Sequence, residues 1–314
     1  MCVDLHHGKR IVITILVCGH DVVIIMHKEG DALLIQQPVY YPFREVIEDN
    51  GRIFVNNQLH YEDGKYTIDF EDFEKKIVDN NVKVFILCNP HNPVGRVWTK
   101  EELEKMGDIC LKHNVVIMDD EIHCDFTYPG FKFTSFMTLD KKYHNSLVLY
   151  TSPSKTFNVA GLQPANIIIK NPELRAAYRK ANAAAGYSQG SIMGQVAVKS
   201  VYTKGDEWVN ELVEYITGNM NYMRDFVKEN FPKAQFVDPE GTYLTWVDFS
   251  GYGFTDEELE HIMVEEAHLW LDSGKVFGPA TAQFERFNLA CPRATVVKAM
   301  EQLKAALDNH TKWA

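Results

Sequence analysis

The chain has 314 residues, of which 46% are hydrophobic and 24% are charged. This composition is typical of a globular protein with one large or two moderate domains. The formal net charge is −11, and the lysines and arginines form no cluster. These features argue against nucleic acid or an anionic membrane surface as a partner, so we expect a small-molecule substrate.

The cysteines favour a reducing compartment, because their spacing contains no CxxC pair and no disulfide framework. We therefore expect reduced, mostly buried thiols in a cytoplasmic protein. The six cysteines are Cys2, Cys18, Cys88, Cys110, Cys124 and Cys291.

An apolar stretch from Ile11 to Met26 has the look of a membrane or signal segment. His20 and Asp21 interrupt it, and it is shorter than the roughly 20 residues that a membrane helix needs. No small-residue cleavage pattern follows, which argues against a signal peptide. We expect two buried strands here, or a strand and a helix.

Between residues 31 and 170, short apolar runs alternate with helical patterns. Strands are predicted at residues 31–37, 82–88, 115–118, 147–150 and 165–170, with a weaker one at 55–61. Helices are predicted to begin at Asp69 and at Thr99, where Glu102 completes a capping box. Strands that are apolar on both faces and separated by helices predict an α/β fold. Its sheet should be mostly parallel, with helices covering both faces.

From Asp206 onward the pattern changes to a long helix with an apolar stripe. A strand at 241–248, a helix capped by Thr255, a strand at 287–293 and a final helix from Thr295 follow. We therefore expect a large domain over residues 1–205 and a smaller α+β domain over 206–314.

Lys155 lies at the centre of the stretch LVLYTSPSKTFNVAGLQ, which begins at Leu147. The apolar run ends where small hydroxyl residues begin, so this lysine should follow the carboxyl end of a buried strand. Ligands of open α/β sheets bind outside those ends, and a lysine there can act as an amine nucleophile. Without further context, a solvated loop lysine would be the simpler interpretation.

Four other features accompany Lys155 along the chain. Tyr40 lies in a PxY sequence, Asn92 in NPHNPVG, Asp120 and His123 in DEIH, and Arg293 ends ACPR. Together with SxSKTFN, these motifs in this order resemble the aspartate aminotransferase superfamily of pyridoxal-phosphate (PLP) enzymes. The resemblance covers nearly the whole chain and implies the PLP-dependent transferase fold.

The resemblance implies a role for each residue. Lys155 would bind the cofactor covalently and then move protons, and Asp120 would keep the pyridine nitrogen protonated. Asn92 and His123 would hydrogen-bond the phenolic oxygen of the ring, and Tyr40 would stack on its face.

The remaining residues would hold the charged groups of cofactor and substrate. Ser152 and Ser154 would offer hydroxyls to the phosphate. Arg293 would bind the α-carboxylate of the substrate with its two-pronged guanidinium.

Each of these residues also has a structural interpretation when taken alone. The carboxylates and histidine from Asp119 to His123 could form a metal site, although a second ligand cluster is lacking, so no metal is expected. Asn92 could shape a turn. Tyr40 and His123 could be core residues, and Arg293 could be a salt-bridge partner.

Within the superfamily, NPHNPVGRVWTKEEL, DDEIH and FNLACPR resemble the cystathionine β-lyase, or cysteine-S-conjugate β-lyase, branch. Aminotransferases usually place a phosphate-binding arginine eight residues after the lysine, where this chain has Gln163. The implied reaction is α,β-elimination, which yields pyruvate, ammonia and a thiol. An aminotransferase remains the alternative, since transamination shares every step up to the carbanion.

The amino-terminal end departs from the family pattern. Relatives begin some 70 to 80 residues earlier, with a segment that helps to cover the active site of a typically dimeric enzyme. The family's phosphate-binding loop and helix would start after Thr14, but the segment here is several residues shorter and richer in β-branched residues than a helix prefers. Gly19 is a candidate for the family's glycine and is not assigned to it. A third interpretation is therefore a weakly active remnant that binds a protein partner.

Overall fold

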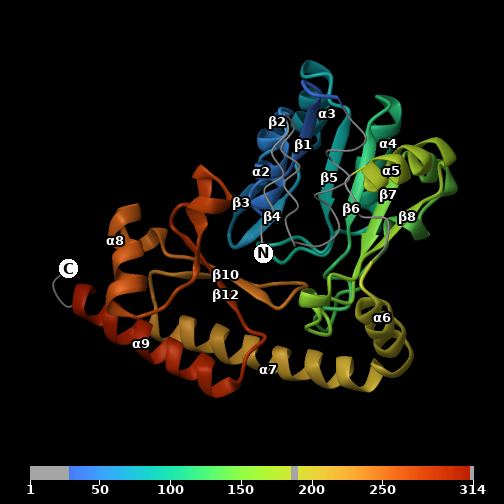
Figure 1. Cartoon of the computed structure of the whole chain (residues 1–314). Coiled ribbons are helices and arrows are strands. Elements are labelled where there is room, and N and C mark those ends of the chain that lie inside the picture. Colours follow the sequence, from blue (N-terminus) through green and yellow to red (C-terminus); the bar gives the residue numbers. More distant parts are fainter. Residues whose placement is uncertain (1–27, 185–189, 312–314) are drawn as a thin grey trace.

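A computed structural model describes residues 28–184 and 190–311 (Figure 1). The apolar stretch 11–26 lies outside the described residues. The predicted phosphate-binding segment at Thr14 and Gly19 therefore does too.

The larger part of the molecule is built on a six-stranded sheet with the strand order β2-β1-β5-β6-β7-β8. Neighbouring strands are parallel except for β7 and β8, which are antiparallel. The prediction of a mostly parallel sheet is confirmed. The strands are β1 (Ala32–Ile35), β2 (Ile53–Asn56), β5 (Val84–Cys88), β6 (Val116–Asp120), β7 (Leu147–Thr151) and β8 (Asn166–Ile169).

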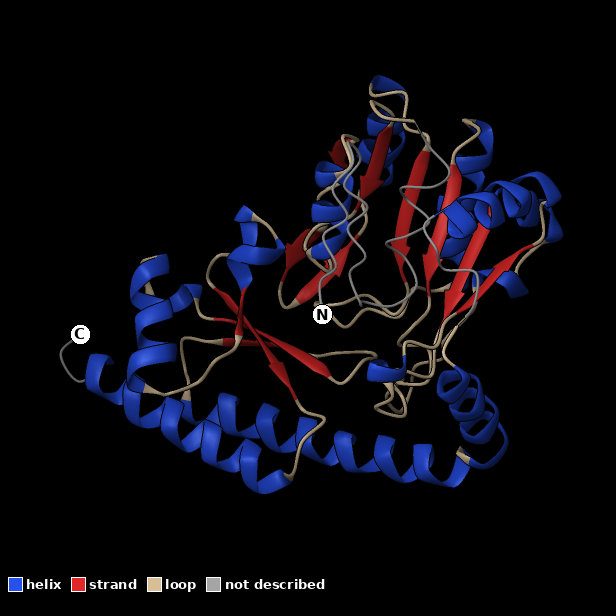
Figure 2. Ribbon diagram, in the orientation of Figure 1, coloured by secondary structure: helices blue, strands red, loops and turns tan. Residues whose placement is uncertain are grey.

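Helices cover both faces of this sheet, as the two-sided apolar pattern predicts (Figure 2). The side chains of β5 alternate between them: Val84 and Ile86 pack in one cluster with Phe43 and Ile47 of α2 (Pro42–Asp49). Phe85 and Leu87 pack in the other cluster with α3 (Phe70–Asp79) and α4 (Lys100–Lys112). α5 (Pro172–Ala184) lies on the α2 side through Leu174 and Tyr178.

The predicted helix starts follow from capping chemistry. Asp69 accepts hydrogen bonds from the first turn of α3, and Thr99 and Glu102 form the capping box of α4. The weak strand expected at 55–61 is instead divided between β2 and a short hairpin, β3 (His60–Glu62) and β4 (Lys65–Thr67). Residues 57–59 belong to no strand and separate the two pieces, so a single continuous strand was the wrong prediction.

The carboxyl-terminal part is an antiparallel sheet, ordered β11-β12-β10-β9, packed on helices (Figure 1). The helix α7 (Asp206–Asn230) begins at the predicted position, and α6 (Ile192–Lys204) precedes it. The division of the chain into domains at residues 205 and 206 stays a prediction. The other elements are β9 (Gln235–Val237), β10 (Leu244–Asp248), α8 (Asp256–His261), β11 (Asp272–Ser273), β12 (Phe284–Asn288) and α9 (Arg293–Thr311).

The last strand and helix differ from the prediction. β12 ends at Asn288, and Arg293 is the first residue of α9, so the expected strand at 287–293 is wrong. The physical reason is Pro292, which has no N–H for a ladder but suits the start of a helix. Thr295 and Val296 N–H groups donate to its carbonyl oxygen.

Candidate active site

A cavity of about 300 Å³ lies at the carboxyl ends of the parallel strands, where they meet the carboxyl-terminal part. Cys88 and Asp120 end β5 and β6, and Lys155 follows β7 by four residues. This is the place where open α/β sheets bind ligands. The lining residues are Tyr40, Tyr41, Cys88, Asn92, Asp120, Ile122, His123, Lys155, Tyr243, Leu244, Asp272, Arg286 and Asn288.

Asp120 is the last residue of β6 and its side chain is buried. The backbone N–H of Ile122 donates to its Oδ1 over 3.1 Å. Burial raises its pKa from 3.8 to about 7, although that N–H and the charge of Lys155 oppose the shift. A carboxyl group that is this costly to ionise is a strong partner for a cation brought into the cavity.

Lys155 is half-buried and lines the same cavity as Asp120. Burial lowers the pKa of its ammonium, the charge of Arg286 lowers it further, and Asp120 opposes the shift. The neutral amine, which is the nucleophilic form, is therefore easier to reach than for a surface lysine. The two residues on which the sequence interpretation depends come together.

Asn92 belongs to the turn-rich loop after β5. Its backbone N–H donates to the sulfur of Cys88 over 3.5 Å, and its Oδ1 accepts from Nη1 of Arg286 over 2.9 Å. The amide thus joins the sheet edge to β12 of the carboxyl-terminal part. This contact orients the guanidinium of Arg286 into the cavity.

His123 is buried, and its ring lies edge-on to Tyr243 with centroids 5.4 Å apart. Burial lowers its pKa to about 3, with further contributions from Lys155 and Arg286. The ring is therefore neutral at physiological pH. Its Nδ1 has no hydrogen-bond partner among the described residues, which is unusual for a buried polar atom and indicates a ligand group.

Tyr40 lies at the start of α2 and is half-buried, with its ring edge-on to Phe43 at 5.6 Å. Burial is the main reason why its pKa is raised, so its hydroxyl stays protonated. The ring is one wall of the cavity.

Ser152 and Ser154 are buried but do not line the cavity. The two hydroxyl oxygens lie 2.8 Å apart, and Ser152 Oγ lies 2.6 Å from the carbonyl oxygen of Pro164. The backbone N–H of Ser154 also donates to Ser152 Oγ over 3.0 Å. In this structure the two serines fix the turn that carries Lys155.

Arg293 is the one predicted charged site residue that the structure does not bring to the cavity. Its Nε donates to Oδ1 of Asn219 over 2.7 Å, and its backbone N–H donates to the hydroxyl of Tyr215 over 2.7 Å. Its guanidinium also lies over the ring of Tyr222. These contacts hold it against α7, so the assignment of the substrate carboxylate to Arg293 needs correction.

Arg286 occupies the cavity instead, and the sequence interpretation missed it. On β12, Arg286 and Asn288 point to one side of the strand, and both line the cavity. The sequence of this strand, FERFN, does not alternate between apolar and polar residues, so no local pattern marked Arg286. Tyr243 and Asp272 were missed because each reaches the cavity from an element without a motif. Tyr41 was missed because the PxY motif directs attention to its neighbour Tyr40.

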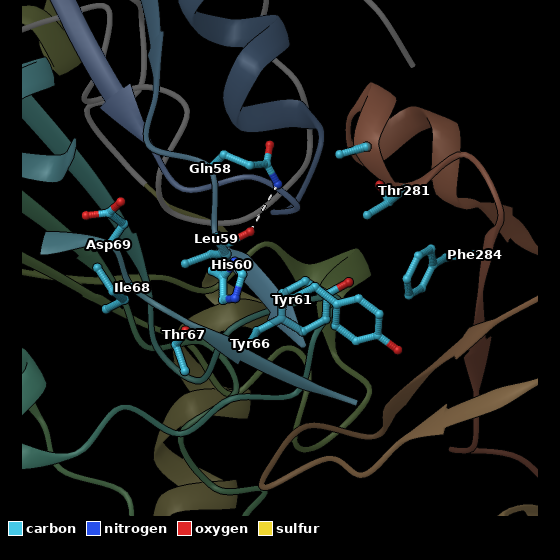
Figure 3. A pocket seen from close by; sticks show the side chains of 11 residues that line it. Gln58, Leu59, His60, Tyr61, Tyr66, Thr67, Ile68, Asp69, Thr281 and Phe284 are labelled. Carbon is cyan, nitrogen blue, oxygen red and sulfur yellow. Dashed lines mark hydrogen bonds between the residues drawn. The ribbon is translucent and has the colours of Figure 1, made fainter. Parts of the chain in front are cut away.

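A second cavity, of about 530 Å³, lies between the β3–β4 hairpin and the segment before β12 (Figure 3). Tyr61, Tyr66 and Phe284 line it, and the ring of Tyr61 lies edge-on to that of Phe284 with centroids 5.3 Å apart. It contains none of the predicted site residues. Within residues 28–184 and 190–311, no three His, Cys, Asp or Glu side chains are placed to hold a metal ion.

The raised pKa of Asp120 predicts a pH-dependent stability of the ligand-free protein. The folded state keeps a proton that the unfolded chain releases, so this stabilisation is complete below pH 3.8 and is lost as pH rises through about 7. From about pH 5 to about pH 8, wild type should lose about 2–3 kcal/mol of unfolding free energy relative to Asp120→Asn. Urea unfolding of both proteins at the two pH values measures this. An equal difference at both values would contradict it.

A family model described as aminotransferase class I and II matches residues 19–303 of the chain. The chain is 41% identical to the protein named cystathionine beta-lyase PatB of Bacillus subtilis, over 88% of this chain and 72% of that protein. It is 30% identical to Protein MalY of Escherichia coli, over 88% and 71% of the two chains.

Solved structures agree with these relatives. The PLP-containing structure of cystalysin from Treponema denticola superposes with a TM-score of 0.91 at 37% identity, covering 93% of this chain and 74% of that one. A PLP-bound C–S lyase from Staphylococcus hominis gives 0.84 at 34% identity, covering 92% and 71%. The resemblance that the motifs carry is confirmed, and the chain belongs to the aminotransferase class I and II family.

Proposed function

We propose that this chain is a PLP-dependent C–S β-lyase that acts on cystathionine or other cysteine S-conjugates. The observation that carries the proposal is the meeting of Lys155, Asp120 and Arg286 in one cavity. The sequence also supports the proposal, because the chain is 41% identical to a protein named cystathionine beta-lyase. The products would be pyruvate, ammonia and a thiol.

The residues in the cavity fit PLP. Asp120 is a buried carboxyl suited to a protonated pyridine nitrogen, and the partnerless Nδ1 of His123 needs a polar group. Asn92 supplies a polar side chain to the cavity, and Tyr40 supplies an aromatic ring. The prediction of PLP as the cofactor is borne out by the PLP-bound relatives. We propose that Ser152 and Ser154 lie near the phosphate without contacting it directly, since their hydroxyls hydrogen-bond within the turn that carries Lys155.

When bound, PLP supplies an electron sink for the negative charge that develops at Cα. Asp120 holds the proton on the pyridine nitrogen, which keeps that sink effective. The amine of Lys155 takes the proton from Cα, and the Cβ–S bond then breaks with its electron pair leaving on sulfur. The Lys155 ammonium can return its proton to the departing sulfur.

Arg286 replaces Arg293 as the proposed binder of the substrate α-carboxylate. A guanidinium offers two parallel N–H donors to a carboxylate, and Asn92 holds this one in place through Nη1. Binding at this point orients the substrate so that its Cα–H bond faces Lys155.

The proposal is tested by incubating purified protein and added PLP with L-cystathionine. We expect pyruvate, ammonia and a thiol in equal amounts, at a rate that does not depend on a 2-oxo acid. An aminotransferase is the second candidate, because a solved relative at 40% identity carries the description putative aminotransferase. Acceleration by a 2-oxo acid, with no thiol released, would favour that candidate instead.

We also propose that the protein is a homodimer that pairs through α6. This helix exposes Ile192, Met193 and Val196 to the extent of 77%, 63% and 54% of their surfaces. An apolar row of this kind on a helix is typical of an interface. Ile192→Glu combined with Val196→Glu should shift the protein from dimer to monomer in sedimentation analysis. A wild-type monomer at micromolar concentration would refute this assignment.

A cytoplasmic location is part of the proposal. It is supported by the four described cysteines, Cys88, Cys110, Cys124 and Cys291, which are all free thiols. Among the described helices, none has the length and apolar character needed to cross a bilayer.

A further inference from the structure

Asp272 is a cavity residue for which the proposed reaction has no use. It lies on β11 directly opposite Arg286 on β12, and its Oδ2 is ion-paired with Nη2 of that arginine. Its side chain is 42% exposed, whereas that of Arg286 is 12% exposed. The carboxylate of Asp272 therefore lies at the open side of the cavity.

The charges that line the cavity can be assigned one by one. Lys155 and Asp120 belong to the cofactor, and His123 is neutral. Arg286 is proposed to bind the substrate α-carboxylate. Among the described lining residues, Asp272 is then the one charge to which the proposed reaction gives no role.

Binding of the substrate carboxylate to Arg286 changes the surroundings of the Asp272 carboxylate. A carboxylate that takes both prongs of Arg286 must share or replace the Nη2 contact of Asp272, since Nη1 is held by Asn92. Two carboxylates then lie beside one guanidinium, and Asp272 is available to any cationic group nearby. Its neighbour Tyr41 offers a neutral hydroxyl, because burial and the charge of Asp272 raise its pKa.

We propose that Asp272 sets the charge preference for the substrate side chain beyond sulfur. Cysteine S-conjugates that carry an ammonium group there are preferred, and those that carry a second carboxylate are disfavoured. This inference rests on the proposed C–S lyase function and specifies its substrate class. Like charges brought together in a partly buried site are strongly disfavoured, so one residue suffices for such selection.

The kinetic test uses three conjugates of similar size: S-(2-aminoethyl)-L-cysteine, S-propyl-L-cysteine and S-carboxymethyl-L-cysteine. In wild type, kcat/KM for pyruvate release should fall about 10-fold from the cationic to the neutral conjugate, and about 10-fold again to the anionic one. In Asp272→Asn the three values should agree within about 3-fold. Glu265→Gln, which removes an exposed charge outside the cavity, is the matched control and should keep the wild-type order.

A binding measurement separates this inference from the proposed function. L-Lysine, L-norleucine and L-2-aminoadipate differ in the same way in charge but have no leaving group at Cβ. Calorimetric titration of PLP-loaded protein should give the affinity order lysine, norleucine, aminoadipate, and Asp272→Asn should remove this order. If no conjugate yields pyruvate while this pattern holds, the lyase function fails and the charge preference stands.

Two results would overturn the inference. One is an unchanged order of conjugates in Asp272→Asn. The other is an equal fall in KM for all three conjugates, which would mean that Asp272 only competes with the α-carboxylate for Arg286. Either result would leave the lyase function intact as long as pyruvate is released.

Discussion

Lys155→Ala should abolish pyruvate release from L-cystathionine, with kcat falling by at least about 10⁴-fold. The amine both binds the cofactor and moves the Cα proton in the proposed reaction, and alanine can do neither. Pyruvate is measured by coupling to lactate dehydrogenase, at saturating PLP so that weaker cofactor binding does not account for the loss. The change should leave the fold intact, because Lys155 is half-buried and lies in a loop beyond β7.

Lys170→Ala is the matched control for this variant. Lys170 is exposed, follows β8 and does not line the cavity, so its loss should leave kcat within about 2-fold of wild type. Wild-type turnover by Lys155→Ala would end the enzymatic interpretation of this residue.

Arg286→Lys should lower kcat/KM by about 10²–10³-fold, whereas Arg293→Lys should change it by less than about 5-fold. A lysine at residue 286 keeps the positive charge but loses the two parallel N–H donors and the contact with Asn92. The guanidinium of Arg293 contacts Asn219 and Tyr222 of α7, so its replacement should affect packing against that helix and not substrate binding.

This pair of variants decides between the two arginines. A large loss for Arg293→Lys together with normal kinetics for Arg286→Lys would restore the assignment made from the ACPR motif. Thermal unfolding of both variants separates a loss of stability from a loss of substrate binding.

The parallel sheet could be predicted because its strands are short runs with one repeated property. In VFILC of β5 every side chain is buried, so neither face can be polar and the run is apolar throughout. The same is true of most of β6 and β7, whose charged or hydroxyl residues are confined to their carboxyl ends. The helix starts at Thr99 and Thr255 were equally accessible, since a capping box is a local interaction over four residues.

Arg286 could not be identified as a cavity residue from the sequence, because its position in the cavity depends on the register of β12. Arg286 and Arg293 are both close to an apolar strand-like sequence, and the sequence interpretation extended the strand to the second of them. The true boundary is set by pairing of β12 with β10, in which Leu244 lies opposite Asn288 and the ladder ends. This pairing joins residues that are more than 40 positions apart in the sequence, so no local pattern indicates it.

Asp272 and Tyr243 could not be predicted as cavity residues, for a related reason. Asp272 reaches the cavity only through the pairing of β11 with β12, and Tyr243 through its ring contact with His123. Asp272 lies in no predicted element, and the predicted strand at 241–248 does not indicate which of its faces meets the cavity. Asp120, Asn92 and Lys155 were predictable because each ends or follows a strong strand of one sheet, whose parallel ends meet at one edge.

The most direct test of the account is to locate the lysine that binds the cofactor. Borohydride treatment of the PLP-loaded protein makes the bond between carbonyl and amine permanent, and peptide mass spectrometry then identifies the modified residue. We expect a pyridoxyl group on Lys155 at about one per chain, and a coenzyme absorption that changes in Asp120→Asn. A modification on another lysine, or none on Lys155 at saturating PLP, would contradict it.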